Sequence, residues 1–255
     1  MTRVLYLAWQ DKHGSSTHGE PSRQWFPVGR LDVGNESGYQ FRYIKGAIAA
    51  HEKAGFQPLD AFPELRKDYR SRHLFALFRN RVPSPDRGDY QSILKRLDLP
   101  PGADPFEILA VSGGARQTDN LEVFPRIEKR PDGGFACRFF LHGWRYVNES
   151  AKARLKQLKT DEDLQVSVEL NNPATGVALQ LQTSNDYHIL GWAPRYLISD
   201  LLSAIIEAPQ NLYARVVQVN PPPAPHNQRV LLEFGGYLPD EIEPMSDEQF
   251  EPLVA

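Results

Sequence analysis

LQVSVELNNPATGVALQL, residues 164–181, is the stretch that decides the fold of the second half of this chain. Leucine and valine alternate with polar residues on both sides of the turn sequence from Asn171 to Gly176. Because successive side chains of a strand point to opposite faces, this alternation gathers the apolar side chains on one face of a sheet. The stretch therefore predicts an antiparallel hairpin with one buried face.

Further strands and two helices are expected around this hairpin. The expected strands are 135–141, 212–219 and 229–234. One helix follows Asn148, a candidate N-cap, and has Ala151, Leu155 and Leu158 on one face; the other covers 196–207. Short strands at this spacing favour a small, OB-like β-barrel with helical inserts.

The first half mixes strands and helices, so the fold class expected for the whole chain is α+β. Apolar or alternating runs predict strands at 4–9, 25–31, 39–43 and 121–124. Helical patterns occupy 45–53, 64–81, 86–97 and 104–111, and prolines and glycines separate them. The polar stretch 125–134 suggests a boundary, which gives a first domain at 1–127 and a second at 135–236. We expect the acidic tail 237–255 to be mobile.

Composition narrows the possible functions. Residues 142–236 carry 8 Lys and Arg against 9 Asp and Glu, so this half is not broadly basic, and duplex binding through many phosphate contacts is not expected. Cys137 cannot form an internal disulfide, which points to a reducing, cytoplasmic location, and we expect it in the core. No run approaches the length of a membrane span. The seven histidines match no zinc motif, and we expect no catalytic residue, metal or cofactor.

Two glycine-led motifs flank the hairpin and suggest a binding site. Gly143-Trp144-Arg145-Tyr146 precedes it, and Gly191-Trp192 with Arg195 follows it. Arginine with aromatic side chains is the combination that holds a phosphate and stacks a base. The two motifs therefore look like two walls of one groove. The alternative is structural, with the aromatic rings packed in a small barrel and arginine bonded to a carboxylate.

The region from about Cys137 to Ile206 resembles the HIRAN domain, which occurs fused to fork-remodelling helicases and also alone in bacterial proteins. The resemblance rests on the turn at 143–146, the strand 164–170, the pair Asn172-Pro173 before the strand at 177–181, and Leu190-Gly191-Trp192-Ala193 before a helix. It implies an OB-like barrel, which in the eukaryotic fork-remodelling members of the family binds single-stranded DNA at a free 3′ end.

By this resemblance, Arg145 contacts a phosphate, Tyr146 stacks on a base, and Arg195 meets the DNA backbone, while Trp192 stands where the family can have a histidine. Thr175 is a departure, because the family often has there an acidic residue that contacts the terminal 3′ hydroxyl. A threonine hydroxyl can hydrogen-bond a sugar but lacks that charge. Ala174 replaces an aromatic residue. We therefore expect the residues of the DNA site to be Trp144, Arg145, Tyr146, Asn172, Thr175, Trp192 and Arg195.

The first half resembles, more loosely, the N-terminal subdomain of HipA-type toxin kinases. The similar pieces are Phe41-Arg42-Tyr43, Phe62-Pro63, residues 74–81 and residues 106–114. The resemblance implies a detached accessory subunit, because no kinase core follows. The surface expected to bind a partner lies on the basic stretch 66–96 and includes Arg70, Phe75, Phe78, Arg79 and Arg81. This stretch also fits a solvated helix face or a docking place for the acidic tail.

These observations lead to two hypotheses. The first is a non-enzymatic module whose groove holds a DNA strand, with single-stranded DNA preferred. The second is an antitoxin-like subunit that binds a HipA-type kinase, with DNA binding secondary or lost.

Overall fold

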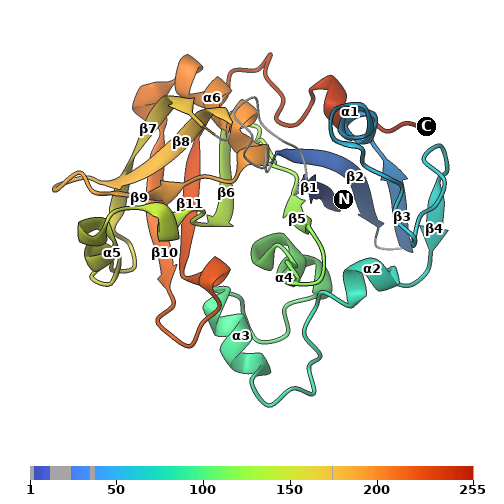
Figure 1. The fold of residues 1–255 in the computed structure, drawn as a ribbon, viewed down its shortest axis with the longest axis horizontal. Helices are drawn as coiled ribbons and strands as arrows, with labels where there is room; N and C mark the ends of the chain where they lie inside the picture. The colour runs from blue at the N-terminus through green and yellow to red at the C-terminus, as the bar shows by residue number, and fades with distance from the viewer. Residues whose placement is uncertain (1–2, 12–23, 35–37, 174, 255) are drawn as a thin grey trace. The chain divides into compact units, whose positions relative to one another are not determined.

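The computed structural model describes residues 3–11, 24–34, 38–173 and 175–254. The chain divides into two compact units, and each contains helices and one antiparallel sheet (Figure 1). The first unit contains Met1–Tyr90, Gly102–Arg126 and Met245–Ala255, and the second contains Gln91–Pro101 and Ile127–Pro244. The expected α+β class is confirmed, but the chain passes between the units more often than the expected boundaries allow.

The first unit is built on a five-stranded antiparallel sheet with the order β4-β3-β2-β1-β5. Its strands are β1 (Arg3–Gln10), β2 (Trp25–Gly34), β3 (Gly38–Tyr43), β4 (Tyr69–Ser71) and β5 (Leu121–Pro125). One face is buried against an apolar core in which the Phe41 ring stacks on Phe62, with centroids 3.9 Å apart. The other face carries polar side chains of β2 and β3, which are described below.

Two helices of this unit begin and end where their sequence predicts. Helix α1 (Lys45–Ala54) stops at Gly55, whose φ of 71° is left-handed. Helix α4 (Pro105–Ser112) starts with a capping box, because Asp104 accepts from the Glu107 amide and Glu107 accepts from the Asp104 amide.

The long helix expected at 64–81 is wrong. The segment forms the short strand β4 and the short helix α2 (Ala76–Arg79). The Tyr69 hydroxyl accepts from the Glu64 amide and donates to the Glu64 carbonyl, which fixes a turn. β4 also pairs with β3, and Phe62, Tyr69 and Phe75 pack edge to face. Tertiary packing here outweighs helix propensity.

Residues 245–254 belong to the first unit, so the expectation of a mobile tail is wrong for this part. Phe250 is buried, and its ring lies 4.7 Å from Tyr6. Pro252 pairs with Ile44, and Lys45 Nζ lies 2.8 Å from a Glu248 oxygen and 2.7 Å from a Glu251 oxygen. Acidic residues of the tail thus meet Lys45 on α1 rather than the basic stretch 66–96.

The second unit is built on a six-stranded antiparallel sheet with the order β6-β11-β10-β7-β8-β9. Its strands are β6 (Gly134–Phe140), β7 (Asp163–Asn172), β8 (Gly176–Thr183), β9 (Ile189–Trp192), β10 (Tyr213–Val219) and β11 (Val230–Tyr237). Its helices are α3 (Tyr90–Arg96), α5 (Glu149–Leu155) and α6 (Ile198–Glu207). The β7–β8 hairpin lies where its alternating sequence predicts, with Leu164 opposite Thr183 and Asn172 opposite Gly176.

Helix α5 follows the sequence closely. The Asn148 side chain accepts from the Ala151 amide, and Ala151, Leu155 and Leu158 are buried as expected. Cys137, on β6, is also buried as expected, and burial raises the pKa of its thiol. A core thiol of this kind is unreactive.

Candidate nucleic-acid interface

The two glycine-led motifs meet at the edges of the six-stranded sheet. β6 and β9 are the edge strands, and just after β6 the backbone of His142 pairs with that of Trp192. The His142 amide donates to the Trp192 carbonyl at 3.0 Å, and the Trp192 amide donates to the His142 carbonyl at 2.9 Å. This bridge joins the edges of the sheet and places Trp144–Tyr146, a 3-10 turn called η1, next to β9.

Gly143 makes this approach possible. Its φ is 67°, a left-handed value that favours glycine, and a Cβ there would lie 2.5 Å from Cε3 of Trp192. The indole therefore packs directly against the backbone that leads into η1. The sequence predicted this proximity from the two motifs, and the structure brings them together through backbone pairing.

The three side chains of η1 have different surroundings. Trp144 is partly buried and donates from Nε1 to the His226 carbonyl at 2.8 Å. Arg145 is exposed, and the exposed fraction of Tyr146 is 69%. A ring this exposed offers a face to a ligand without any rearrangement of the core.

Glu169, near the end of β7, is part of the site although the sequence analysis missed it. Its Oε2 accepts from Trp192 Nε1 at 2.8 Å and from Asn172 Nδ2 at 2.9 Å. Burial raises the pKa of Glu169, but hydrogen bonds from Asn172, Trp192 and Gln180 outweigh burial and leave this pKa lowered. The site thus contains a carboxylate that stays ionised at neutral pH.

The remaining predicted residues lie at the turn of the hairpin and after β9. Thr175 donates from Oγ1 to Asn172 Oδ1 at 3.1 Å, so these two residues form one hydrogen-bonded group with Glu169. Arg195 is partly buried in the 3-10 turn that precedes α6. Ala174 lies outside the described residues.

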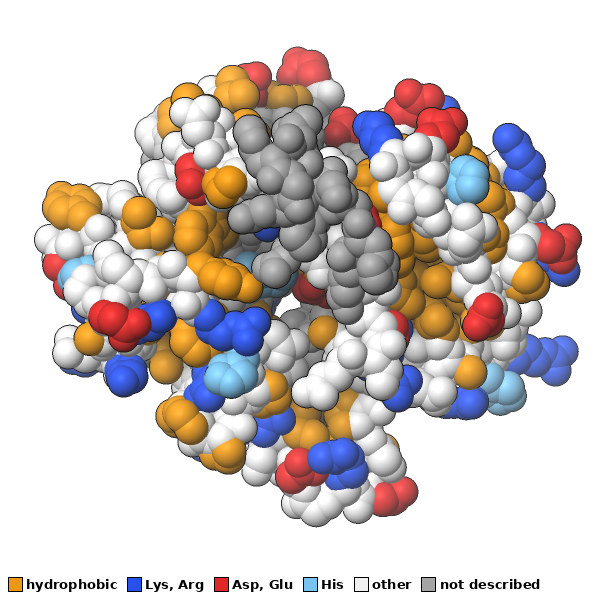
Figure 2. All heavy atoms as spheres, viewed as in Figure 1, with side chains coloured by type: hydrophobic (Ala, Val, Ile, Leu, Met, Phe, Trp, Pro, Cys, Tyr) orange, Lys and Arg blue, Asp and Glu red, His pale blue; other side chains and the backbone are white. Residues whose placement is uncertain are grey.

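Figure 2 shows basic, acidic and hydrophobic side chains mixed over the visible face of the second unit. This mixture agrees with the near-neutral charge of residues 142–236. A ligand held here would rely on a few specific contacts more than on a broad field of positive charge.

Two of the five residues expected to bind a protein partner in the first unit are core residues. Phe78 is fully buried beside Phe41, with ring centroids 5.9 Å apart. Arg81 is buried and donates to the Gly114 carbonyl and to both carboxylate oxygens of Asp119. These residues stabilise the fold and present no surface to a partner.

The other three differ among themselves. Phe75 is half-buried against Phe62, whereas Arg70 and Arg79 are exposed. The expected partner surface is thereby reduced to two arginines and part of one ring.

Other kinds of site find no support in the described part of the chain. Within it, no group of three or more His, Cys, Asp and Glu side chains is placed to hold a metal ion. Nor does any helix described here combine the length and the apolar character that crossing a bilayer requires.

Comparisons with known proteins leave the identity open. Neither a protein-family model nor a curated protein sequence matches this chain. The chain is similar to a protein from Lactobacillus plantarum of known crystal structure, with 21% identity over 41% of this chain and 100% of that one. The TM-score of 0.30 is too low to carry an argument about fold or function. The resemblances to HIRAN domains and to HipA-type subdomains remain predictions.

Proposed function

We propose that the second unit binds single-stranded DNA at the surface formed by η1, the end of β9 and the turn of the β7–β8 hairpin. The observation that carries the proposal is the His142–Trp192 bridge, because it places exposed Arg145 and Tyr146 beside Trp192. We expect Arg145 to donate to a backbone phosphate and Tyr146 to stack on a base.

The chemistry of the surface favours a single strand over a duplex. Bases of a single strand are free to stack on an exposed ring, and each stacked base contributes about 1–3 kcal/mol. Ionised Glu169 would repel a phosphate placed against Trp192, so the phosphate contact belongs at Arg145. The polar group of Glu169, Asn172 and Thr175 would instead receive a sugar hydroxyl.

The proposal is tested by fluorescence anisotropy of labelled oligonucleotides with the full chain. Three probes are compared at low and moderate salt: a single strand with a free 3′ hydroxyl, the same strand with that hydroxyl blocked, and a duplex. We expect the single strands to bind more tightly than the duplex. With one or two phosphate contacts, log K should fall with log salt concentration with a slope of about −1.

Arg145→Ala should weaken binding about tenfold or more, since a hydrogen bond to a charged group contributes about 1.5–3 kcal/mol. Arg130→Ala is the matched control. Arg130 is also an exposed arginine of the second unit, but it precedes β6, whereas Arg145 follows the other end of that strand and lies at the proposed DNA surface. Equal affinities of the two variants would overturn the proposal. Absence of binding at low salt would also overturn it and would favour the accessory-subunit hypothesis, which a pull-down with a HipA-type kinase then tests.

A further inference from the structure

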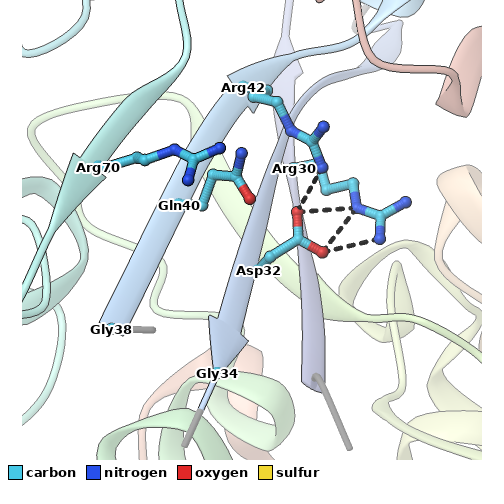
Figure 3. A pocket seen from close by; sticks show the side chains of 7 residues that line it. All are labelled: Arg30, Asp32, Gly34, Gly38, Gln40, Arg42 and Arg70. Atoms are coloured by element: carbon cyan, nitrogen blue, oxygen red, sulfur yellow. Dashed lines mark hydrogen bonds and ion pairs between the residues drawn. The ribbon is translucent and has the colours of Figure 1, made fainter. Parts of the chain in front are cut away.

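The polar face of the first sheet contains a hollow of about 250 Å³ whose lining includes three arginines (Figure 3). Its lining residues come from three neighbouring strands: Arg30, Asp32 and Gly34 of β2, Gly38, Gln40 and Arg42 of β3, and Arg70 of β4. Both glycine-led motifs belong to the second unit, so the hollow shares no residue with the proposed DNA surface.

Strand register explains why these residues meet. Arg30 stands opposite Arg42 and Asp32 opposite Gln40 across the β2–β3 pair, and Gln40 stands opposite Arg70 across the β3–β4 pair. Residues two apart on a strand share a face, so the side chains form one polar patch. Like charges directly opposite each other are unfavourable, and the Arg30–Arg42 pair therefore needs a counterion.

Asp32 is that counterion, and the arginines use all of its capacity. Arg30 donates to it from Nε and Nη2, and Arg42 donates from Nη2 at 3.0 Å. Burial lowers the pKa of Arg30, but the hydrogen bonds and charge of Asp32 outweigh it and leave the pKa raised. One carboxylate is thus shared by two guanidinium groups, so one of the two positive charges is not neutralised.

Donors remain unused in the hollow. Among the described residues, Arg42 Nε is shielded from solvent and has no hydrogen-bond partner, and Nη1 of Arg30 and of Arg42 donates to no residue. Arg70 is exposed and donates from Nε to Asp68, which also accepts from Gln40, so its Nη groups extend beyond that pair. The donors that an anion in the hollow can reach are the Nη1 groups of Arg30 and Arg42 and the Nη groups of Arg70.

We infer that this hollow binds the phosphate group of a small phosphate monoester. Planar guanidinium groups match the oxygens of phosphate in a two-point geometry that lysine cannot reproduce. The volume lies below the roughly 300–1,000 Å³ typical of pockets for drug-sized ligands, which suits a small anion. A phosphate dianion would more than offset the residual charge of Arg30, Arg42 and Asp32, and Arg70 supplies a further donor.

Isothermal titration calorimetry on the full chain tests this inference, at an ionic strength held constant with sodium chloride. The probes are inorganic phosphate, glycerol 3-phosphate and, as a dicarboxylate of similar charge, malonate. We expect saturable binding of both phosphates and weaker binding of malonate. No saturable binding of either phosphate, or malonate binding as tightly, would overturn the inference.

Variants assign the binding to the hollow. Arg42→Gln should weaken phosphate binding about tenfold or more, and Arg70→Gln, at an exposed position that does not threaten folding, about threefold to fivefold. Arg87→Gln is the control, because Arg87 is an exposed arginine of the same unit that pairs with Asp89 outside the hollow. Equal effects of Arg70→Gln and Arg87→Gln would contradict the site even if Arg42→Gln fails to fold.

The proposed DNA surface and the proposed phosphate site can be tested independently of each other. Arg145→Ala should leave phosphate affinity unchanged, and Arg70→Gln should leave single-strand affinity unchanged. A variant that changed both would mean that the phosphate probe and the DNA strand share one site, which would overturn the assignment to the hollow.

Discussion

Arginine has a different setting in the two units. In the first, Arg30 and Arg42 come from neighbouring strands, are largely buried, and share the carboxylate of Asp32. In the second, Arg145 lies on a short turn between two aromatic residues and is exposed. The two settings differ in what the sequence reveals: a short motif singles out Arg145 and its aromatic neighbours, whereas no motif marks Arg30 and Arg42, which strand register brings together.

The difference extends to stability. Removing the shared carboxylate leaves two facing cations on the sheet, so the hollow is coupled to folding. Removing Arg145 takes away an exposed side chain, which rarely changes stability by more than about 0.5 kcal/mol. The largest stability effects should therefore arise where the charges are buried.

Asp32→Ala should have the largest effect. Breaking a buried ion pair from one side destabilises by roughly 3–5 kcal/mol, because the uncompensated charge stays in place. The free energy of unfolding from urea titration measures it. Asp89→Ala removes an exposed partner of Arg87 and should lower stability by less than about 1 kcal/mol. Similar losses in both variants would erase the contrast between buried and exposed arginine pairs.

Gly143→Ala should follow in size and tests how the second site is assembled. A left-handed backbone costs a residue with a side chain about 1–2 kcal/mol, and the Trp192 ring would also have to move. Gly176→Ala is the matched comparison, since its φ is 73° but nothing lies within 4 Å of the added Cβ. The difference between the two unfolding free energies isolates the contact with Trp192. If both variants lose the same stability, the close approach contributes nothing.

Glu169→Gln should reveal a pH dependence in the second site. Because the pKa of Glu169 is lowered on folding, its stabilising contribution is fully present above the unfolded value of about 4.3 and is lost as pH falls through the folded value. The stability advantage of the wild type over Glu169→Gln should therefore be constant near neutrality and shrink below about pH 4. Unfolding titrations of both proteins from pH 7 to pH 3 measure it, and a constant difference throughout would contradict the assigned ionisation.

Thr175→Asp should give the smallest effect, a change of preference between DNA ends. A carboxylate at this position strengthens a hydrogen bond to a terminal hydroxyl, so the ratio of affinities for free and blocked 3′ ends should rise about twofold to tenfold. Anisotropy titrations with the two strands measure the ratio. Thr175→Asn, which lacks the charge, is the control, and an equal rise in both variants would attribute the effect to shape.

Local sequence signals were sufficient for much of the fold. The alternation in 164–181 predicted the β7–β8 hairpin, and the Asn148 cap predicted α5, because each depends on residues a few positions apart. The helix expected at 64–81 was wrong because distant aromatic residues and pairing with β3 decide that segment.

The sites divide in the same way. The motifs at 143–146 and 191–192 predicted that their aromatic residues and arginine lie close together, and the backbone bridge between His142 and Trp192 brings the two motifs side by side. Glu169 gave no signal, since it occupies an ordinary polar position of a strand until Trp192 and Asn172 donate to it. The arginine hollow depends on the register of β2, β3 and β4, which no short motif encodes.

The packing of Phe250 against Tyr6 has a consequence for the order in which the protein assembles. The first unit is completed by residues 245–254, which the ribosome makes after the whole of the second unit. Both segments of the second unit, Gln91–Pro101 and Ile127–Pro244, precede Phe250 in the chain, so this unit can condense during synthesis while the first still lacks Phe250. A nascent chain stopped at residue 236 would lack the Phe250 ring that packs on Tyr6, so a chaperone that binds apolar surface should remain bound until residues 245–254 are added.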